Sequence, residues 1–97
     1  MLNKTRKIQK IRLPKHAATF HSLHKWHKNL FQELGWIVLI KAKGYNDKVR
    51  VYKHSIKTYL DTARHVLSEY ESQNRKHDIN VLIMNVEVLK QFVDSNL

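Results

Sequence analysis

Three histidines, each three residues after the last, are the side chains in this chain whose type and spacing come closest to a metal site. They are His21, His24 and His27. On a helix a step of three residues turns the side chain by about 300°, so the outer two point about 120° apart. Metal-binding helices instead place two histidines at i and i+4 beside an acid, and no acid precedes Glu33. The pattern therefore favours a basic helix face over a metal site, and we predict no bound metal or cofactor. The residues of this basic face are His21, His24, Lys25, His27 and Lys28.

Other side chains that perform enzyme chemistry lack the arrangement it needs. The chain has no Cys, which excludes disulfides and a thiolate nucleophile. His54 and Ser55 are adjacent, so on a helix they point about 100° apart and cannot act as base and nucleophile. The eight acids are scattered beside bases, and the sequence contains no glycine-rich phosphate loop and no HExxH. We predict that the protein is not an enzyme, has no catalytic residues and takes no small-molecule substrate.

Most of the positive charge lies in the first third of the chain. The net charge is +10, and residues 1–32 contain eight basic groups and no acid. Cations at this density repel one another and keep a chain extended unless a partner takes it up. We therefore predict an extended basic arm over residues 1–15 and a folded domain over residues 16–97. A secretory signal is not expected, since no apolar stretch of the required length follows the charges.

Aliphatic side chains interrupt the charges of the predicted arm. Ile8, Ile11 and Leu13 contribute nothing to phosphate binding, but they suit a groove on a protein surface. The cations alone suit the phosphates of nucleic acid. We predict that the arm binds a partner through both kinds of side chain, namely Lys4, Arg6, Lys7, Ile8, Lys10, Ile11, Arg12, Leu13 and Lys15.

The pattern of apolar residues in the first half of the domain predicts helix. A stripe at helical spacing predicts a helix over residues 17–34, and Gly35 is expected to form its left-handed C-terminal cap. The apolar run at residues 36–40 fits a short buried helix ended by Gly44, or a buried strand paired with residues 49–52. We favour the helix, because a lone two-stranded hairpin is marginally stable.

Two longer helices are predicted in the second half. The first is capped by Asn46 or Asp47, and the second by Asp78 after a polar break over residues 71–77. The predicted fold is all-α, a small helical bundle of two long antiparallel helices with an N-terminal helix and a short buried segment. The residues predicted to share one core are Leu30, Leu34, Tyr52, Ile56, Tyr59, Ala63, Val66, Leu82, Val86 and Leu89.

Four segments of the domain resemble small uncharacterised proteins encoded by large nucleocytoplasmic DNA viruses, including those of algae. The segments are residues 30–39, 41–45, 52–56 and 75–79. The similarity covers about residues 23–96 and transfers no catalytic or ligand-binding residue. The resemblance implies a virus-encoded protein that is a minor component of the particle.

Composition, arm and resemblance together predict a non-enzymatic structural protein of a large assembly. We expect a minor capsid protein of the cement type, whose arm bridges neighbouring capsid subunits. Its expected location is the virion, after synthesis in the host cytoplasm. The alternative is a nucleic-acid-binding or genome-packaging protein that uses the same arm against phosphates. No membrane-spanning segment is expected, since the longest apolar run is residues 36–40.

Overall fold

The computed structural model describes residues 20–97, so the arm predicted over residues 1–15 lies outside them. The described residues form three helices: α2 (Phe20–Ala42), α3 (Asn46–Glu69) and α4 (Gln73–Asn96). No strand occurs among them, and 91% of them are helical. The all-α prediction is confirmed, and the favoured helix over residues 36–40 is correct.

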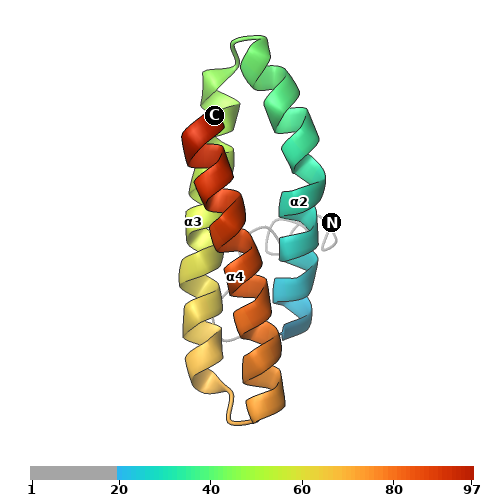
Figure 1. The fold of residues 1–97 in the computed structure, drawn as a ribbon, viewed down its shortest axis with the longest axis vertical. Helices are drawn as coiled ribbons and strands as arrows, with labels where there is room; N and C mark the ends of the chain where they lie inside the picture. The colour runs from blue at the N-terminus through green and yellow to red at the C-terminus, as the bar shows by residue number, and fades with distance from the viewer. Residues whose placement is uncertain (1–19) are drawn as a thin grey trace, which may run out of the picture.

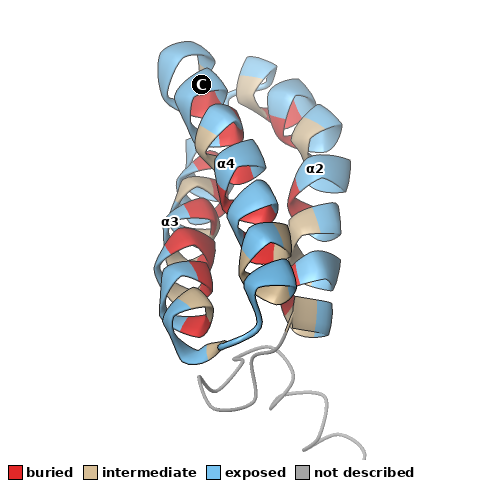
Figure 2. Ribbon diagram, turned by 60° about the horizontal axis from the view of Figure 1, so that its bottom comes forward, coloured by how far each residue is buried: buried red, intermediate tan, exposed pale blue. Residues whose placement is uncertain are grey.

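The three helices pack side by side along their length. α2 and α4 run in the same direction and α3 runs in the opposite direction (Figure 1). Short connections at residues 43–45 and 70–72 make consecutive helices antiparallel neighbours. Each helix contacts both others. The buried residues line the sides that the helices turn toward one another (Figure 2).

One hydrophobic core joins the three helices. All the residues predicted to share it are buried except Leu34, which is half-buried and packs against it. Burying an aliphatic side chain contributes roughly 1.5–3 kcal/mol, so these contacts outweigh the weak helix propensity of the β-branched residues. The hydroxyl of Tyr52 donates a hydrogen bond of 2.5 Å to the Leu30 carbonyl, which ties α3 to α2 inside the core.

The first helix is longer than the sequence predicted, because it continues through Gly35. Among the described residues only Gly44 has a positive φ, of 93°. The Gly44 N–H donates to the Lys41 carbonyl and the Tyr45 N–H to the Ile40 carbonyl, which is the Schellman termination of a helix. The prediction of a cap at Gly35 is wrong, since glycine inside a helix costs only about 1 kcal/mol relative to Ala.

The predicted short buried segment over residues 36–40 is therefore the end of one long helix. Ile37 and Ile40 are buried, whereas Trp36, Val38 and Leu39 are exposed. A helix surface turns by about 100° per residue, so a run of five apolar residues must point some of them outward. The expectation that the whole run is buried is wrong for this reason.

The two glycines give opposite expected results when replaced by Ala. Gly44→Ala should lower the free energy of unfolding by about 1 kcal/mol, because its φ disfavours any residue with a Cβ. Gly35→Ala should raise it by up to about 1 kcal/mol, since nothing lies within 4 Å of the added Cβ. Thermal unfolding of both variants checks this pair. Effects of the same sign would contradict the end of α2 at Ala42.

The start of α3 differs from the prediction. Tyr45 occupies the N-cap position, and no side chain accepts a hydrogen bond there. Asn46 and Asp47 already lie in the first turn, so the predicted capping by one of them is wrong. Asp47 instead pairs with Arg50 one turn on, and its charge favours the N-terminal end of the helix.

The start of α4 lies inside the predicted polar break. The hydroxyl of Ser72 caps the helix by accepting a hydrogen bond of 3.3 Å from the Arg75 N–H. Asp78, the predicted cap, lies in the second turn and pairs with Arg75 at 3.5 Å. The prediction failed because a first turn that projects into solvent needs no apolar residue to be helical.

Candidate functional site

The outward side of α2 carries one continuous stripe of exposed residues, here called the α2 face. Its members are spaced three or four residues apart and are turned away from the core positions of the same helix (Figure 2). The last one follows directly after the end of α2. The α2 face consists of His21, Lys25, Lys28, Gln32, Trp36, Leu39 and Lys43.

The cations of the α2 face have no acidic partner among the described residues. All six ion pairs in this part of the chain lie on α3 and α4, within one helix or between them. Lys25, Lys28 and Lys43 take part in none of them. They therefore remain available to an anionic partner, and they continue the acid-free charge of residues 1–32.

Two large apolar side chains lie in the middle of these cations. Trp36 is 52% exposed and Leu39 is 53% exposed, and at i and i+3 they are neighbours on the helix surface. The sequence analysis missed both as site residues because it treated their apolar run as core. Helical phase was the available signal, since Trp36 follows Lys25 by eleven residues, about three full turns.

His24 and His27 lie to one side of the α2 face. They form a row of rings with Phe20 and Phe31, with successive centroids 6.0, 6.4 and 4.8 Å apart. His27 is half-buried, and its ring lies 6.4 Å from that of Tyr59 on α3. The structure thus divides the predicted basic face into outward residues, namely His21, Lys25 and Lys28, and two histidines within an aromatic row.

The half-buried ring of His27 favours its neutral form. Burial, and then the charge of His24, lower the pKa of His27 from its usual 6.5. Within residues 20–97 its Nε2 is buried without a hydrogen-bond partner, as is the hydroxyl of Tyr59. The positive charge of the surface near pH 7 therefore comes from the lysines of the α2 face rather than from His27.

This depressed pKa predicts that acid destabilises the bundle. Below pH 6.5 the unfolded chain takes up a proton that the folded state resists, so stability is lost as the pH falls from there through the folded pKa. His27→Phe keeps the ring contacts and should remove this part of the pH dependence, whereas His21→Phe, at an exposed site, should not. Urea unfolding across a pH series measures both. An unchanged profile in His27→Phe would show that the ring is not protected from protonation.

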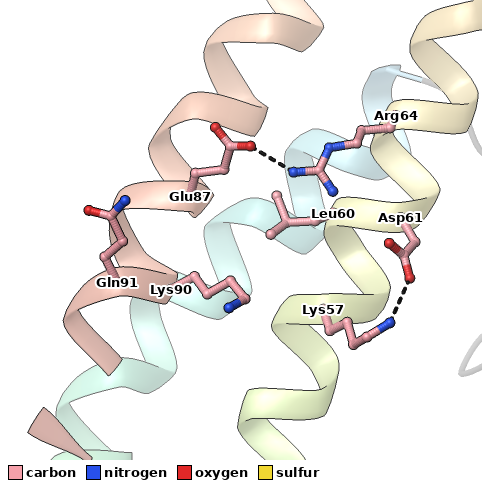
Figure 3. Close-up of a pocket in the computed structure, with 7 residues that line it drawn as sticks. All are labelled: Lys57, Leu60, Asp61, Arg64, Glu87, Lys90 and Gln91. Carbon is pink, nitrogen blue, oxygen red and sulfur yellow. Dashed lines mark hydrogen bonds and ion pairs between the residues drawn. The ribbon is translucent and has the colours of Figure 1, made fainter. Parts of the chain in front are cut away.

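A groove between α3 and α4 is a second hollow in the described structure, with a volume of about 510 Å³ (Figure 3). Its charged groups satisfy one another. Arg64 donates to Glu87 at 2.6 Å across the groove, and Lys57 donates to Asp61 at 3.3 Å on one wall. A ligand would have to displace these pairs, so the groove is a weaker candidate site than the α2 face. Its lining residues are Lys57, Leu60, Asp61, Arg64, Glu87, Lys90 and Gln91.

Metal binding and membrane insertion find no support in the described helices. Over residues 20–97, no three metal-ligating side chains form a group that could hold an ion. None of the helices α2 to α4 has the length and apolar character needed to cross a bilayer. Comparisons of the chain with known protein families, curated proteins and solved structures find no match. The functional argument therefore rests on the residues themselves.

Proposed function

We propose that this protein is a non-enzymatic structural protein of a large assembly, and that its α2 face and N-terminal arm bind neighbouring protein subunits. The observation that carries this proposal is the combination of unpaired lysines with the exposed Trp36 and Leu39 on one helix. Protein interfaces commonly surround an apolar centre, often a Trp, with a polar rim. A partner surface with an apolar pocket and acidic flanks would match both parts of the α2 face.

The arm would extend this contact to a second subunit. Ile8, Ile11 and Leu13 would anchor in a groove of the partner, while the six basic residues of positions 1–15 pair with acids or backbone carbonyls. The residues that precede Phe20 can reach at most about 60 Å from it. A molecule held by both surfaces would bridge two neighbours, which is how a cement protein stabilises a shell.

The assembly that we propose is the capsid of a large DNA virus. Support comes from the resemblance carried by residues 30–39, 41–45, 52–56 and 75–79. In this role the protein is a minor capsid protein, synthesised in the host cytoplasm and incorporated into the virion. Its partners are capsid subunits.

Nucleic-acid binding is the second candidate, and the unpaired lysines of the α2 face are the observation that favours it. Together with the six cations of residues 1–15, they would neutralise phosphates along a strand. Trp36 would then stack on a base. This candidate gives no role to Ile8, Ile11 and Leu13, because phosphate contacts do not use aliphatic side chains.

Two arm variants of the full chain distinguish the candidates. One replaces Ile8, Ile11 and Leu13 with Ser and keeps every charge; the other replaces all six basic residues of positions 1–15 with Gln. Three buried aliphatic side chains contribute roughly 1.5–3 kcal/mol each before ordering costs, so the Ser variant should fail to enter assembled particles.

The DNA measurement provides the counterpart. If phosphates are the target, the Gln variant should lose much of the salt dependence of binding to a DNA duplex, at roughly 0.9 per phosphate contact, while the Ser variant binds normally. Normal incorporation of the Ser variant, together with failure of the Gln variant, would overturn the structural function in favour of nucleic-acid binding.

A further inference from the structure

α4 has apolar side chains on two sides, although only one side faces the core. Its buried residues include Leu82, Val86 and Leu89. Four further apolar residues at spacings of three and four form a stripe on the outer side, here called the α4 stripe. They are Val81, Met84, Val88 and Phe92, exposed by 41%, 61%, 67% and 44%. The outer side of a surface helix is ordinarily polar, so this stripe calls for a partner.

The surroundings of the α4 stripe carry no charge over its length. The polar residues beside it, Asn85 and Gln91, are neutral. The charged residues of the same turns lie toward α3, where Glu87 and Lys90 line the groove between the two helices. Glu87 pairs there with Arg64, so it does not face the stripe.

We propose that the α4 stripe binds the α4 stripe of a second copy of this chain, with the two helices antiparallel about a two-fold axis. Two copies that each carry a net charge of +10 repel, so they can associate closely only through a surface without cations. The α2 face fails this condition, since its unpaired lysines would meet their own kind. The α4 stripe meets it. The basic arm is a poorer occupant, because the stripe offers its cations no acid.

The spacing of the stripe suits antiparallel pairing. With the axis between Met84 and Val88, Phe92 of one copy lies against Val81 of the other, and Met84 against Val88. Each contact then joins a large side chain to a small one, and the two-fold axis repeats it. A parallel pair would instead set Phe92 against Phe92 and Val against Val, which fills the interface less evenly.

The size of the stripe sets the expected affinity. It extends over about 16 Å of helix, and four partly exposed side chains on each copy fall short of the roughly 1,200 Å² that a stable interface buries. We therefore expect a weak dimer that forms at micromolar concentrations. Such a dimer would present two α2 faces, and it goes beyond the proposed function without depending on it.

Sedimentation of the full chain over a range of micromolar concentrations tests the dimer. We expect a monomer–dimer equilibrium that Val88→Asp weakens at least about 100-fold, since the axis brings the two new charges close together. Val51→Asp is the matched control, because Val51 on α3 is 66% exposed and lies outside the stripe. A chain that stays monomeric, or equal weakening by both variants, would overturn the proposal.

Cross-linking tests the orientation, since the natural chain has no Cys. A mixture of Val81→Cys and Phe92→Cys molecules should form mixed disulfides readily. Each variant alone should do so slowly, because the antiparallel pair holds identical positions about 16 Å apart along the axis, beyond disulfide reach. Ready self-cross-linking of Val81→Cys would refute the antiparallel arrangement. The variant with Ser at positions 8, 11 and 13 should still dimerise; loss of its dimer would assign the stripe to the arm.

Discussion

Val86→Asp should unfold the bundle at room temperature, whereas the same change at Val88 should leave the fold intact. Val86 is 0% exposed and belongs to the core shared by the three helices, where a carboxylate would have no partner. Burying an unpaired charge costs several kcal/mol. Because the whole stability is roughly 0.05–0.15 kcal/mol per residue, one such change removes most of it in a domain this small. Val88, 67% exposed, keeps its new charge in water.

Far-UV circular dichroism of the two variants measures this contrast directly. The helical signal should persist in Val88→Asp and be largely lost in Val86→Asp. The pair is well matched, since the residue type, the helix and the introduced charge are the same. A folded Val86→Asp would place the core on another side of α4, and an unfolded Val88→Asp would show that the α4 stripe is already buried.

Replacing Trp36 and Leu39 together with Ser should weaken binding to the partner subunit by at least about 30-fold. The central Trp of an interface contributes roughly 2–4 kcal/mol, and each 1.4 kcal/mol changes affinity tenfold. The fold should be unaffected, because both side chains are about half exposed. Incorporation of the variant into particles, relative to the wild-type chain in the same preparation, gives the measurement.

Two controls separate an interface effect from a general one. Val51→Ser removes an exposed apolar side chain of α3 and should incorporate normally. Replacing Lys25, Lys28 and Lys43 with Gln should weaken incorporation less than the loss of Trp36 and Leu39, and chiefly at low salt. If the lysine changes abolish binding and the apolar changes do not, the α2 face binds phosphates rather than protein.

The core of the fold was largely predictable from periodicity. Tyr52, Ile56, Tyr59, Ala63 and Val66 recur at three and four residues, and all are buried in the structure. Such a stripe has one solution, because only one side of a helix can satisfy it. The second apolar stripe of α4 was not separated from the first, and Phe92, assigned to the core side by its spacing, is 44% exposed.

The helix boundaries were predicted less well because they depend on local balances. Gly35 has the residue type of a helix end, yet the burial of Ile37 and Ile40 outweighs its cost and α2 continues. Ser72 was overlooked as a cap because the first turn of α4 has no apolar residue to announce a helix.

The candidate site was predictable only in part. Charge alone identified His21, Lys25 and Lys28, which the structure places outward on one face. Trp36 and Leu39 required the phase of the whole helix, which was lost when the expected helix stopped at Gly35. The inward turn of His27 depends on α3, whose Tyr59 is 32 residues away, and no local pattern encodes that contact.

A photoreactive amino acid at Gln32 tests the central claim most directly. Gln32 is exposed on the α2 face between Lys28 and Trp36, so a label there reports what covers the face without removing an argued contact. After illumination of intact particles, we expect the main adduct to join this chain to a capsid subunit. Adducts confined to nucleic acid would contradict the structural function and establish that the α2 face binds phosphates.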